Sequence, residues 1–400
     1  MVGGPRASGA HEAQQIRSVA SAIALGWPKP ADMTDHCAVV SGSFRSLLLF
    51  DIAEEIDLAL LRSVLGIAES KREPAFRHPT PEYVRFERPP VVEPLQPCRT
   101  EDGSELQTRI RYFDYGVASV ELALPFQTSW EGLVRVANRW IMSPEVERRA
   151  HQLLRERLPG IKQVLKKPYA DWISEDYYLI QIDPIRPESC AIISAEELVR
   201  ERGALIAQIV RGEEAPLSSS ERQEVLQSSL SYYPTDLLVV GWVAALVYDS
   251  PASASATIDL LEYANSQLLE FRYYDEVLTR VLADVYKRLA EKRGFWGQWK
   301  LAREAASLNT IRLDYGELVE RTENAIKFLS DMFYARAYRL AADRIGVGDY
   351  RNLVTDKLRT ARDLYESMVN EFHQARAFLL ELSVVIILVI EIVFLFRGKA

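Results

Sequence analysis

A run of twenty residues near the C-terminus constrains this chain more than any other feature. Residues Ala377–Phe396 read AFLLELSVVIILVIEIVFLF, and sixteen of them are Leu, Ile, Val or Phe. As an α-helix the run would be about 30 Å long, which matches the hydrocarbon core of a bilayer. The sequence therefore predicts one transmembrane helix over residues 377–396, followed by a short tail at residues 397–400.

Two carboxylates interrupt this run, at Glu381 and Glu391. On an insertion scale the sixteen apolar residues favour the membrane by roughly 5–10 kcal/mol, whereas a central acid opposes insertion by about 2.5–3.5 kcal/mol. The balance favours insertion. Two interpretations of Glu391 stay open: it is protonated or reaches the interface near Arg397 and Lys399, or it hydrogen-bonds a second copy of the chain.

The flanks of the run predict its orientation. Four basic residues precede it within the last predicted helix, and two follow it. This bias, together with the absence of a secretory signal in residues 1–37, predicts a tail-anchored, single-pass membrane protein with its bulk on the cytoplasmic or organelle-matrix side. Residues 1–37 are rich in small residues and are predicted to form a disordered leader.

Residues 252–376 carry apolar side chains at alternating steps of three and four. Three such runs begin at Leu261, Leu301 and Val354, and glycines separate them. Sustained repeats of this kind are typical of coiled-coil packing. We predict an antiparallel, coiled-coil-like helical stalk that also forms homo-oligomers.

Trp296 and Trp299 lie between Lys292 and Lys300, in the predicted turn between the first two stalk helices. Trp beside Lys is typical of membrane interfaces, so one interpretation places both rings in contact with lipid headgroups. Because both positions continue the heptad spacing, the alternative is that the rings pack inside the hairpin turn. The sequence leaves both interpretations open.

Residues 38–251 mix strand and helix patterns. Strands or hairpins are predicted at Arg45–Ile52, Leu106–Leu124, Tyr177–Ile182 and Leu237–Tyr248. Capping-box sequences predict helices after Ser194 and Ser218. The predicted fold class is therefore α+β: an N-terminal mixed sheet with helices, followed by the helical stalk and the transmembrane helix.

The composition and the motifs of the sequence argue against several classes of functional site. The net charge of −8 argues against a nucleic-acid binder without excluding one. The three cysteines and five histidines show no metal-ligand spacing, and no nucleotide-binding or hydrolase motif is present. We therefore predict no catalytic, cofactor-binding or metal-binding residues and no cofactor.

One basic cluster could bind an anion. Its clearest members are Arg148, Arg149, Lys166 and Lys167. The ligand would be RNA, a nucleotide or a lipid headgroup, and the alternative is an ordinary solvated helix face.

The order of three features resembles a known family. These are the hairpin sequence Tyr112–Leu122, a strand that ends in Asp249-Ser250-Pro251 before a long helix, and Val389–Ile392 in the apolar run. Together they are similar to the required-for-meiotic-nuclear-division (RMND-type) proteins, a domain-of-unknown-function family, although Ser250 stands where that family commonly has Thr. The resemblance implies a membrane-anchored, self-associating protein with no established catalytic residues.

These observations predict a non-enzymatic scaffold that is anchored by its C-terminus, self-associates through the stalk and presents the α+β domain at the membrane. Its expected partners are membrane lipid, further copies of the chain, and a protein that the sequence does not identify. The alternative function is a membrane-tethered binding or sensing module for an anionic ligand.

Overall fold

The computed structural model describes residues 39–67, 89–100, 103–186, 192–290 and 332–398, with five positions between 311 and 319. The chain divides into two compact units. The first contains residues 1–270 and 323–348, and the second contains residues 271–322 and 349–400. The predicted leader, residues 1–37, lies outside the described residues.

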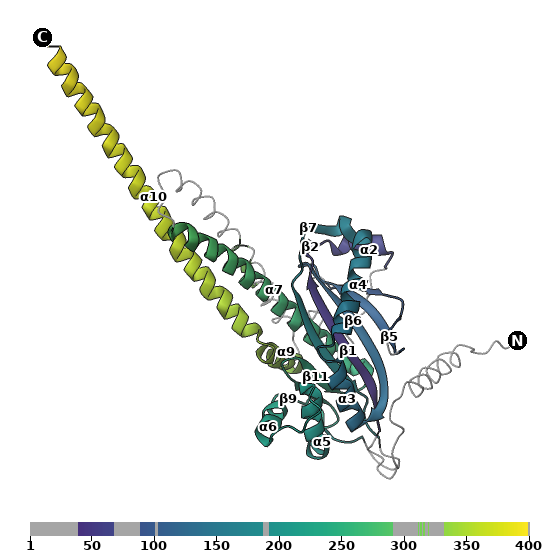
Figure 1. The fold of residues 1–400 in the computed structure, drawn as a ribbon. Coiled ribbons are helices and arrows are strands. Elements are labelled where there is room, and N and C mark those ends of the chain that lie inside the picture. Colours follow the sequence, from purple (N-terminus) through teal and green to yellow (C-terminus); the bar gives the residue numbers. More distant parts are fainter. Residues whose placement is uncertain are drawn as a thin grey trace. The chain divides into compact units, whose positions relative to one another are not determined.

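The first unit is built on a large mixed sheet (Figure 1). In order across the sheet the strands are β3 (Val91–Pro94), β5 (Glu105–Tyr112), β6 (Val117–Ser129), β1 (Val39–Asp51), β8 (Ser174–Ile182), β11 (Ala244–Tyr248), β10 (Leu237–Val240) and β9 (Ser229–Leu230), and β4 (Cys98–Arg99) pairs with β5. The pairing of β8 with β11 is parallel, whereas β1 is antiparallel to both β6 and β8. A separate two-stranded sheet joins β2 (Ala53–Ile56) to β7 (Leu165–Pro168). The predicted mixed sheet is confirmed.

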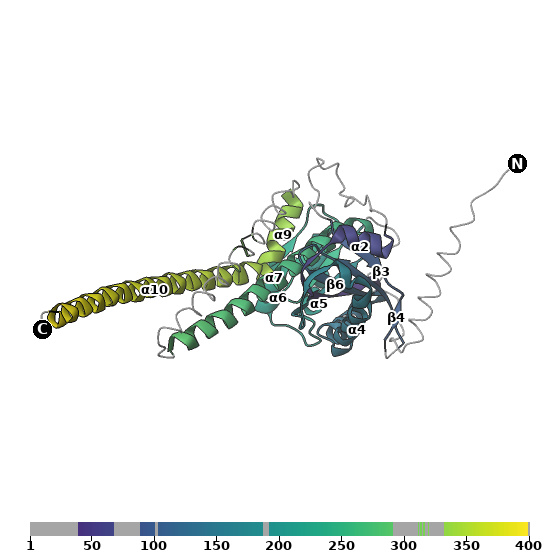
Figure 2. The same cartoon turned by 90° about the horizontal axis from the view of Figure 1, so that it is seen from above.

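The main core is formed by every second side chain along the strands, because these side chains point to the same face of the sheet. On β1, Phe44, Leu48 and Phe50 point to the same face and are buried. Three helices pack on the strands of this sheet (Figures 1 and 2): α3 (Trp130–Trp140), α4 (Pro144–Ile161) and α5 (Ala195–Arg211). Helices α2 (Leu58–Leu65) and α6 (Ser219–Gln227) complete this part of the unit.

The helix starts follow the capping signals. The Ser194 side chain accepts a hydrogen bond from the Glu197 backbone N–H at the start of α5, and Ser218 does the same for Glu221 at the start of α6. Each serine satisfies one of the backbone donors that a helix leaves unpaired at its first turn. Both predicted helix starts are confirmed.

The predicted strand Leu237–Tyr248 is a hairpin of two strands, β10 and β11. Gly241 lies at the turn, where an added Cβ would be 2.5 Å from a Val210 methyl carbon and 2.9 Å from the Ala244 carbonyl oxygen. Only glycine tolerates such a close approach of two chain segments. The continuous apolar sequence hid the turn because both strands are buried.

The other face of the sheet is covered by the first part of α7 (Pro251–Ala290), whose residues 254–270 belong to this unit and are almost all buried. Helix α9 (Met332–Arg344) also belongs to this unit and contacts β10. The Tyr338 hydroxyl on α9 donates a hydrogen bond to Gln267 on α7. The first unit therefore carries helices on both faces of its sheet.

The second unit pairs the later part of α7 with α10 (Val347–Arg397). Lys357 Nζ on α10 lies 2.5 Å from Asp275 Oδ1, and Leu282 packs with Ala361 one to two turns further on. Because later residues of one helix meet later residues of the other, the two helices run in the same direction. This is the relation between the first and third helices of the predicted stalk, whose second helix lies mostly outside the described residues.

The predicted transmembrane helix requires a correction. Residues 377–396 do belong to a helix, α10, but among the residues that the structure describes no helix is long and apolar enough to cross a membrane. The finding contradicts the transmembrane part of the predicted fold class, the tail anchor and the single-pass membrane location. The sequence argument set sixteen apolar side chains against the carboxylates of Glu381 and Glu391, and it underweighted these two interruptions of the run.

Candidate functional site

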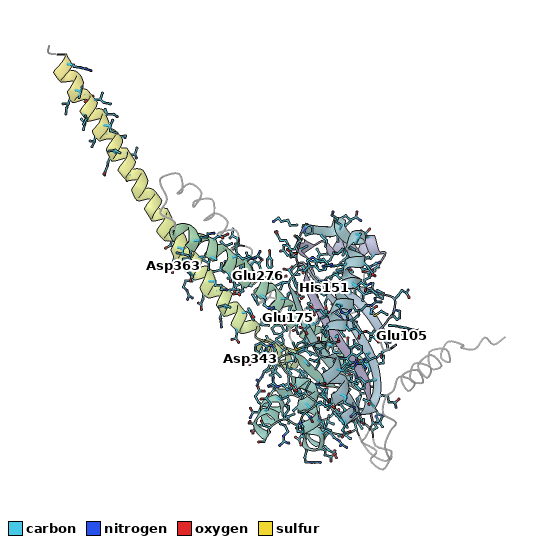
Figure 3. The ribbon with its side chains drawn as sticks, in the orientation of Figure 1. Glu105, His151, Glu175, Glu276, Asp343 and Asp363 are labelled. Atoms are coloured by element: carbon cyan, nitrogen blue, oxygen red, sulfur yellow. The ribbon has the colours of Figure 1, made fainter. Side chains whose placement is uncertain are left out.

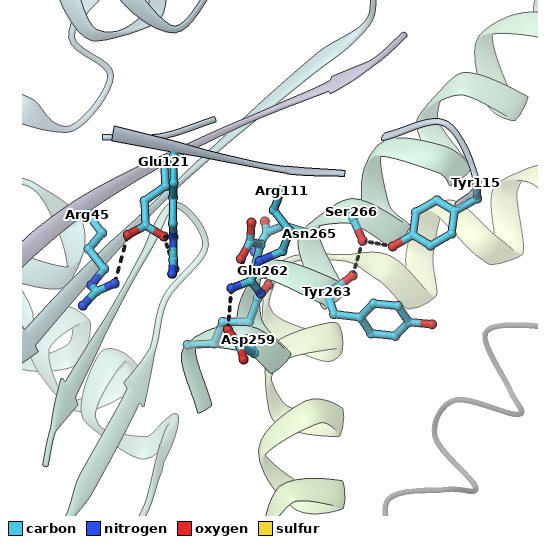
Figure 4. Close-up of polar contacts among 11 residues, drawn as sticks. Arg45, Arg111, Tyr115, Glu121, Asp259, Glu262, Tyr263, Asn265 and Ser266 are labelled. Carbon is cyan, nitrogen blue, oxygen red and sulfur yellow. Dashed lines mark hydrogen bonds and ion pairs between the residues drawn. The ribbon is translucent and has the colours of Figure 1, made fainter. Parts of the chain in front are cut away.

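The second face of the sheet carries a layer of charged side chains (Figure 4). Arg111 on β5 extends toward α7, where its guanidinium lies 2.8 Å from Asp259 Oδ1 and 2.9 Å from Glu262 Oε2. Arg111 and Glu262 are buried, and burial raises the pKa of Glu262 while Arg111 opposes that rise. Burial removes water from both charges, and the ion pair offsets this cost only when the two groups are held in good hydrogen-bonding geometry. This pair therefore fixes the position of α7 against β5.

Glu121 on β6 holds two further arginines in the same layer. Arg45 Nη1 donates to Glu121 Oε1 at 2.9 Å, and Arg109 Nε donates to Oε2 at 2.8 Å. The three arginines of the layer thus face three acids, Glu121 and the two partners of Arg111. Because these charges balance, the layer offers no surplus charge to an ionic ligand, and we interpret it as structural.

Beside the charged layer, a contact between two hydroxyl groups joins the turn between β5 and β6 to α7. The Tyr115 hydroxyl lies 2.5 Å from Ser266 Oγ on α7, and Ser266 Oγ donates to the Tyr263 carbonyl oxygen at 2.7 Å. Burial raises the pKa of Tyr115 well above its ordinary value, so the phenol stays protonated. Tyr115 therefore ties the turn to α7.

A pocket opens beside the hairpin of β10 and β11. Its empty volume is about 520 Å³, which includes an open mouth to solvent. The twelve lining residues come from the segment before β10, from the hairpin, from the start of α7 and from α9: Tyr232, Tyr233, Asp236, Leu237, Leu238, Val247, Tyr248, Asp249, Ser253, Thr257, Phe333 and Tyr334. All of them belong to the first unit.

Five of the twelve lining residues are aromatic, and ring contacts join four of them: Tyr232, Tyr233, Phe333 and Tyr334. The ring of Tyr232 lies 4.8 Å from that of Tyr233 and 5.5 Å from that of Phe333, at interplanar angles of 83° and 68°. Phe333 and Tyr334 meet at 5.4 Å and 74°. Because neighbouring rings are nearly perpendicular, their faces point in several directions instead of stacking in one.

Two carboxylates contribute the charge of the pocket. Asp236 accepts hydrogen bonds from the backbone N–H groups of Tyr232 at 2.8 Å and Tyr233 at 3.1 Å, so it fixes the turn that carries both rings. Asp249 follows β11 directly, and its Oδ1 accepts from the Ser250 N–H at 2.7 Å. No Lys, Arg or His is present among the twelve described residues of the lining. The pocket is therefore aromatic and acidic.

The predicted anion patch is divided between two parts of the first unit. Arg148 and Arg149 are on α4, where Arg149 Nη1 donates to Gln152 at 3.1 Å. Lys166 and Lys167 are on β7, and each forms an ion pair with an acid of β2: Lys166 Nζ lies 2.9 Å from Glu55 Oε1, and Lys167 Nζ lies 2.5 Å from Glu54 Oε2. Anion binding by these four residues stays a prediction, and local acids already neutralise the two lysines.

Of the other predicted contact residues, the structure describes Glu391. Glu391 lies on α10 and is exposed. Trp296 and Trp299 lie outside the described residues, so both interpretations of the two rings stay predictions. Among the described His, Cys, Asp and Glu residues, no group of three or more is arranged to hold a metal ion.

The part of α10 around Glu391 exposes large apolar side chains. We name it the C-terminal apolar segment, and its members are 42–62% exposed: Leu380, Leu382, Val384, Val385, Ile386, Ile387, Leu388, Val389, Ile390, Ile392 and Val393. Contiguous apolar surface of this extent marks an interaction site in a folded protein. It is a second candidate site, separate in sequence from the aromatic pocket.

Sequence reasoning did not find the aromatic pocket. Its signal was present in the adjacent tyrosines of Ser231–Asp236, which precede a buried strand and are followed by Pro234. The decisive partner, Phe333, is about one hundred residues away, and only the fold brings α9 next to β10.

Comparison with known proteins points to one family. A family model described as the N-terminal domain of the uncharacterized protein MJ0711 matches residues 41–255. A curated relative, the uncharacterized protein MJ0711 of Methanocaldococcus jannaschii, is 22% identical over 229 residues, which cover 57% of this chain and 68% of the relative. No solved structure matches the chain.

Proposed function

We propose a scaffold function for this chain, which belongs to the MJ0711 N-terminal domain family by a match over more than half of its 400 residues. The chain self-associates through the C-terminal apolar segment of α10 and thereby displays several copies of its α+β unit. The observation that carries this proposal is the exposure of eleven large apolar side chains between Leu380 and Val393.

The free energy available from this segment is sufficient for association. Full burial of one Val, Leu or Ile side chain contributes about 1.5–3 kcal/mol, so eleven half-exposed side chains represent on the order of 10 kcal/mol per chain. Association costs roughly 4–15 kcal/mol in lost translational and rotational freedom. Two or more chains that bury their segments together would offset this cost.

The distribution of the exposed residues favours more than two copies. Val384–Ile390 are seven consecutive exposed apolar residues, and seven residues make about two turns of an α-helix. They therefore cover every side of α10. A helix that is apolar all round is normally buried, and each helix of a bundle of three or more copies contacts two neighbours and so buries more of its surface than a helix in a dimer does. We therefore propose a bundle of at least three copies.

Two charged substitutions on one side of α10 test this proposal. Ile386→Lys and Ile390→Lys are four residues apart and share a helix face, so the double variant places two like charges in the bundle. We expect sedimentation equilibrium to show a multi-copy mass for the unaltered chain and a clear fall toward one copy for the variant. Leu353→Lys is the matched control, because Leu353 is exposed on α10 outside the segment. An unchanged mass in the double variant would contradict the proposal.

We also propose that the family is a distant relative of the RMND-type proteins. Two local features support the relationship: the Tyr112–Leu122 sequence falls on the β5–β6 hairpin, and Asp249-Ser250-Pro251 joins β11 to the long helix α7. An experimental structure of an RMND-type protein tests this proposal. A strand order different from β5-β6-β1-β8-β11 would argue against common descent.

A further inference from the structure

We infer that the copies associate as a parallel, in-register coiled coil through one apolar stripe of α10. The inference rests on the proposed self-association and extends it, because it names the surface that meets a second copy and the direction in which the copies run. It is carried by three features of α10: an unbroken heptad repeat, the contacts that the first part of this repeat makes inside the chain, and its continuation past the end of α7.

The sequence of α10 carries a heptad repeat over most of its length. Apolar residues recur at alternating steps of four and three, which are the a and d positions of a coiled coil. In order, these positions are occupied by Val354, Leu358, Ala361, Tyr365, Met368, Phe372, Ala375, Leu379, Leu382, Ile386, Val389, Val393 and Phe396. We name the four members that fall in the C-terminal apolar segment the a/d seam: Ile386 and Val393 at a, and Leu382 and Val389 at d.

The first part of the repeat forms a helix–helix interface inside the chain. Val354 and Ala361 are buried and Leu358 is partly buried, whereas Leu353, which is outside the repeat, is exposed. Ala361 packs with Leu282 of α7. The a and d positions are therefore the side of α10 that packs on another helix.

The a/d seam continues this interface beyond the end of α7 (Figure 1). Helix α7 ends at Ala290, eight residues after Leu282, so it accompanies α10 for about eight residues beyond Ala361, to about residue 369. The a/d seam begins later, at Leu382, and its side chains are exposed. One stripe of α10 is thus covered by a helix of its own chain and then exposed. The same stripe of a second copy has the matching repeat and covers it.

Charges beside the repeat favour a parallel arrangement. In a parallel coiled coil a residue at g lies beside the e residue five positions later in the neighbouring helix, and charges at these positions set the orientation. Glu371 occupies a g position of α10, and Arg376 occupies the e position five residues later. The two positions carry opposite charges. In an antiparallel arrangement g faces g and e faces e, so these two charges would not meet.

The same repeat places the carboxylates of the segment away from the a/d seam. Glu391 occupies an f position, which is the farthest from the seam, and Glu381 occupies a c position. Glu391 therefore keeps its contact with solvent in the assembled state. A hydrogen bond from Glu391 to a second copy is not part of this arrangement.

Two lysine variants at adjacent positions test the a/d seam. Ile386 is at a and Ile387 is at b, and their exposed fractions are similar, at 50% and 57%. We expect Ile386→Lys to weaken association at least about tenfold, because each copy loses one buried apolar side chain and gains a charge in the interface. Ile387→Lys should weaken it by less than about threefold, as a surface change does. Equal effects of the two variants in sedimentation equilibrium would overturn the inference.

Disulfide formation between copies tests direction and register. Leu382→Cys and Val393→Cys are separate variants whose positions are eleven residues, or about 16 Å, apart along the helix. A disulfide forms only where the two Cα atoms are within about 7 Å. In parallel, in-register copies each new cysteine faces its own counterpart, so we expect both variants to give disulfide-linked dimers on mild oxidation. In an antiparallel arrangement only one position can face itself, so at most one variant would cross-link.

Two controls set the background for this cross-linking. The unaltered chain reports any disulfides from the native Cys37, Cys98 and Cys190. Glu391→Cys places a cysteine at an f position, where we expect no cross-linking above that background. Failure of either seam variant to cross-link, or equal cross-linking of Glu391→Cys, would overturn the inference.

The mass of the unaltered chain separates the two proposals. A single-copy mass in sedimentation equilibrium would overturn self-association and the coiled coil together. A multi-copy mass with equal effects of the two lysine variants, or with failure of either seam cysteine, would overturn the parallel coiled coil and leave self-association intact.

Discussion

His151 on α4 shows how the environment of one residue sets the pH response of the fold (Figure 3). Its ring stacks on that of Trp172 with centroids 5.6 Å apart, and it forms a T-shaped contact with the Phe50 ring at a centroid distance of 4.7 Å. Burial lowers the pKa of His151 below its ordinary value of 6.5, and the positive charge of Arg155 lowers it further. The imidazole is therefore held neutral by the folded chain more strongly than by the unfolded chain.

This shift predicts that stability falls as the pH falls. Below pH 6.5 the unfolded chain binds a proton at His151 more readily than the folded chain does, so the free energy of unfolding decreases until the folded-state pKa is passed. The contribution is fully present above 6.5. His151→Phe keeps a ring beside Trp172 but cannot titrate. Urea unfolding at a series of pH values should therefore give a flatter profile for the variant, and identical profiles would contradict this role.

At the same scale, the predicted anion patch shows what the sequence could not supply. Arg148 and Arg149 are basic neighbours on a helix in both the prediction and the structure. Lys166 and Lys167 also read as free cations, because their partners Glu54 and Glu55 are more than one hundred residues earlier. Only the pairing of β2 with β7 brings these charges together. Long-range ion pairs of this kind leave no local pattern.

Among the elements, helix α7 depends on the charged layer beneath it. Arg111 reaches from β5 to two acids of α7, and its partner Glu262 is only 1% exposed. Removing one member of a buried pair leaves an uncompensated charge, which costs about 3–5 kcal/mol, whereas replacing both by apolar side chains is often nearly neutral.

A double-mutant cycle tests the role of this pair. We expect Arg111→Met to lower the free energy of unfolding by about 3–5 kcal/mol, and Arg111→Met with Glu262→Met to recover most of that loss. Asp259 remains in both variants and is partly exposed, so it can regain water. Urea unfolding followed by circular dichroism provides the measurement. If the two changes add without recovery, the pair does not hold α7.

The charged layer also explains why the sequence predicted the strands and helix starts but not the helix that covers the second face of the sheet. Helix caps at Ser194 and Ser218 and the hairpin of β5 and β6 follow from local sequence. Helices on both faces of the sheet do not, because Arg109, Arg111 and Glu121 alternate with apolar residues. Such alternation is typical of a strand with one face in solvent. Here the charged face is covered by α7, and its charges neutralise one another.

At the scale of the whole molecule, the apolar composition of residues 377–396 predicted a helix correctly but predicted its surroundings wrongly. The run at residues 377–396 is helical, as expected, and it exposes most of its large side chains. The step from an apolar helix to a membrane span was contradicted. The aromatic pocket was missed for a different reason, since its walls come from segments about one hundred residues apart.

The most direct test of the scaffold account is the molar mass of two chains by light scattering: the full-length protein and a chain that ends at Gln374. The shorter chain keeps the contacts of the second unit around Asp275, Leu282, Lys357 and Ala361 and loses only the C-terminal apolar segment with its flanks. We predict a mass of at least three copies for the full-length protein and of one copy for the shorter chain. Equal masses for the two chains, whether single or multiple, would contradict the claim that this segment drives assembly.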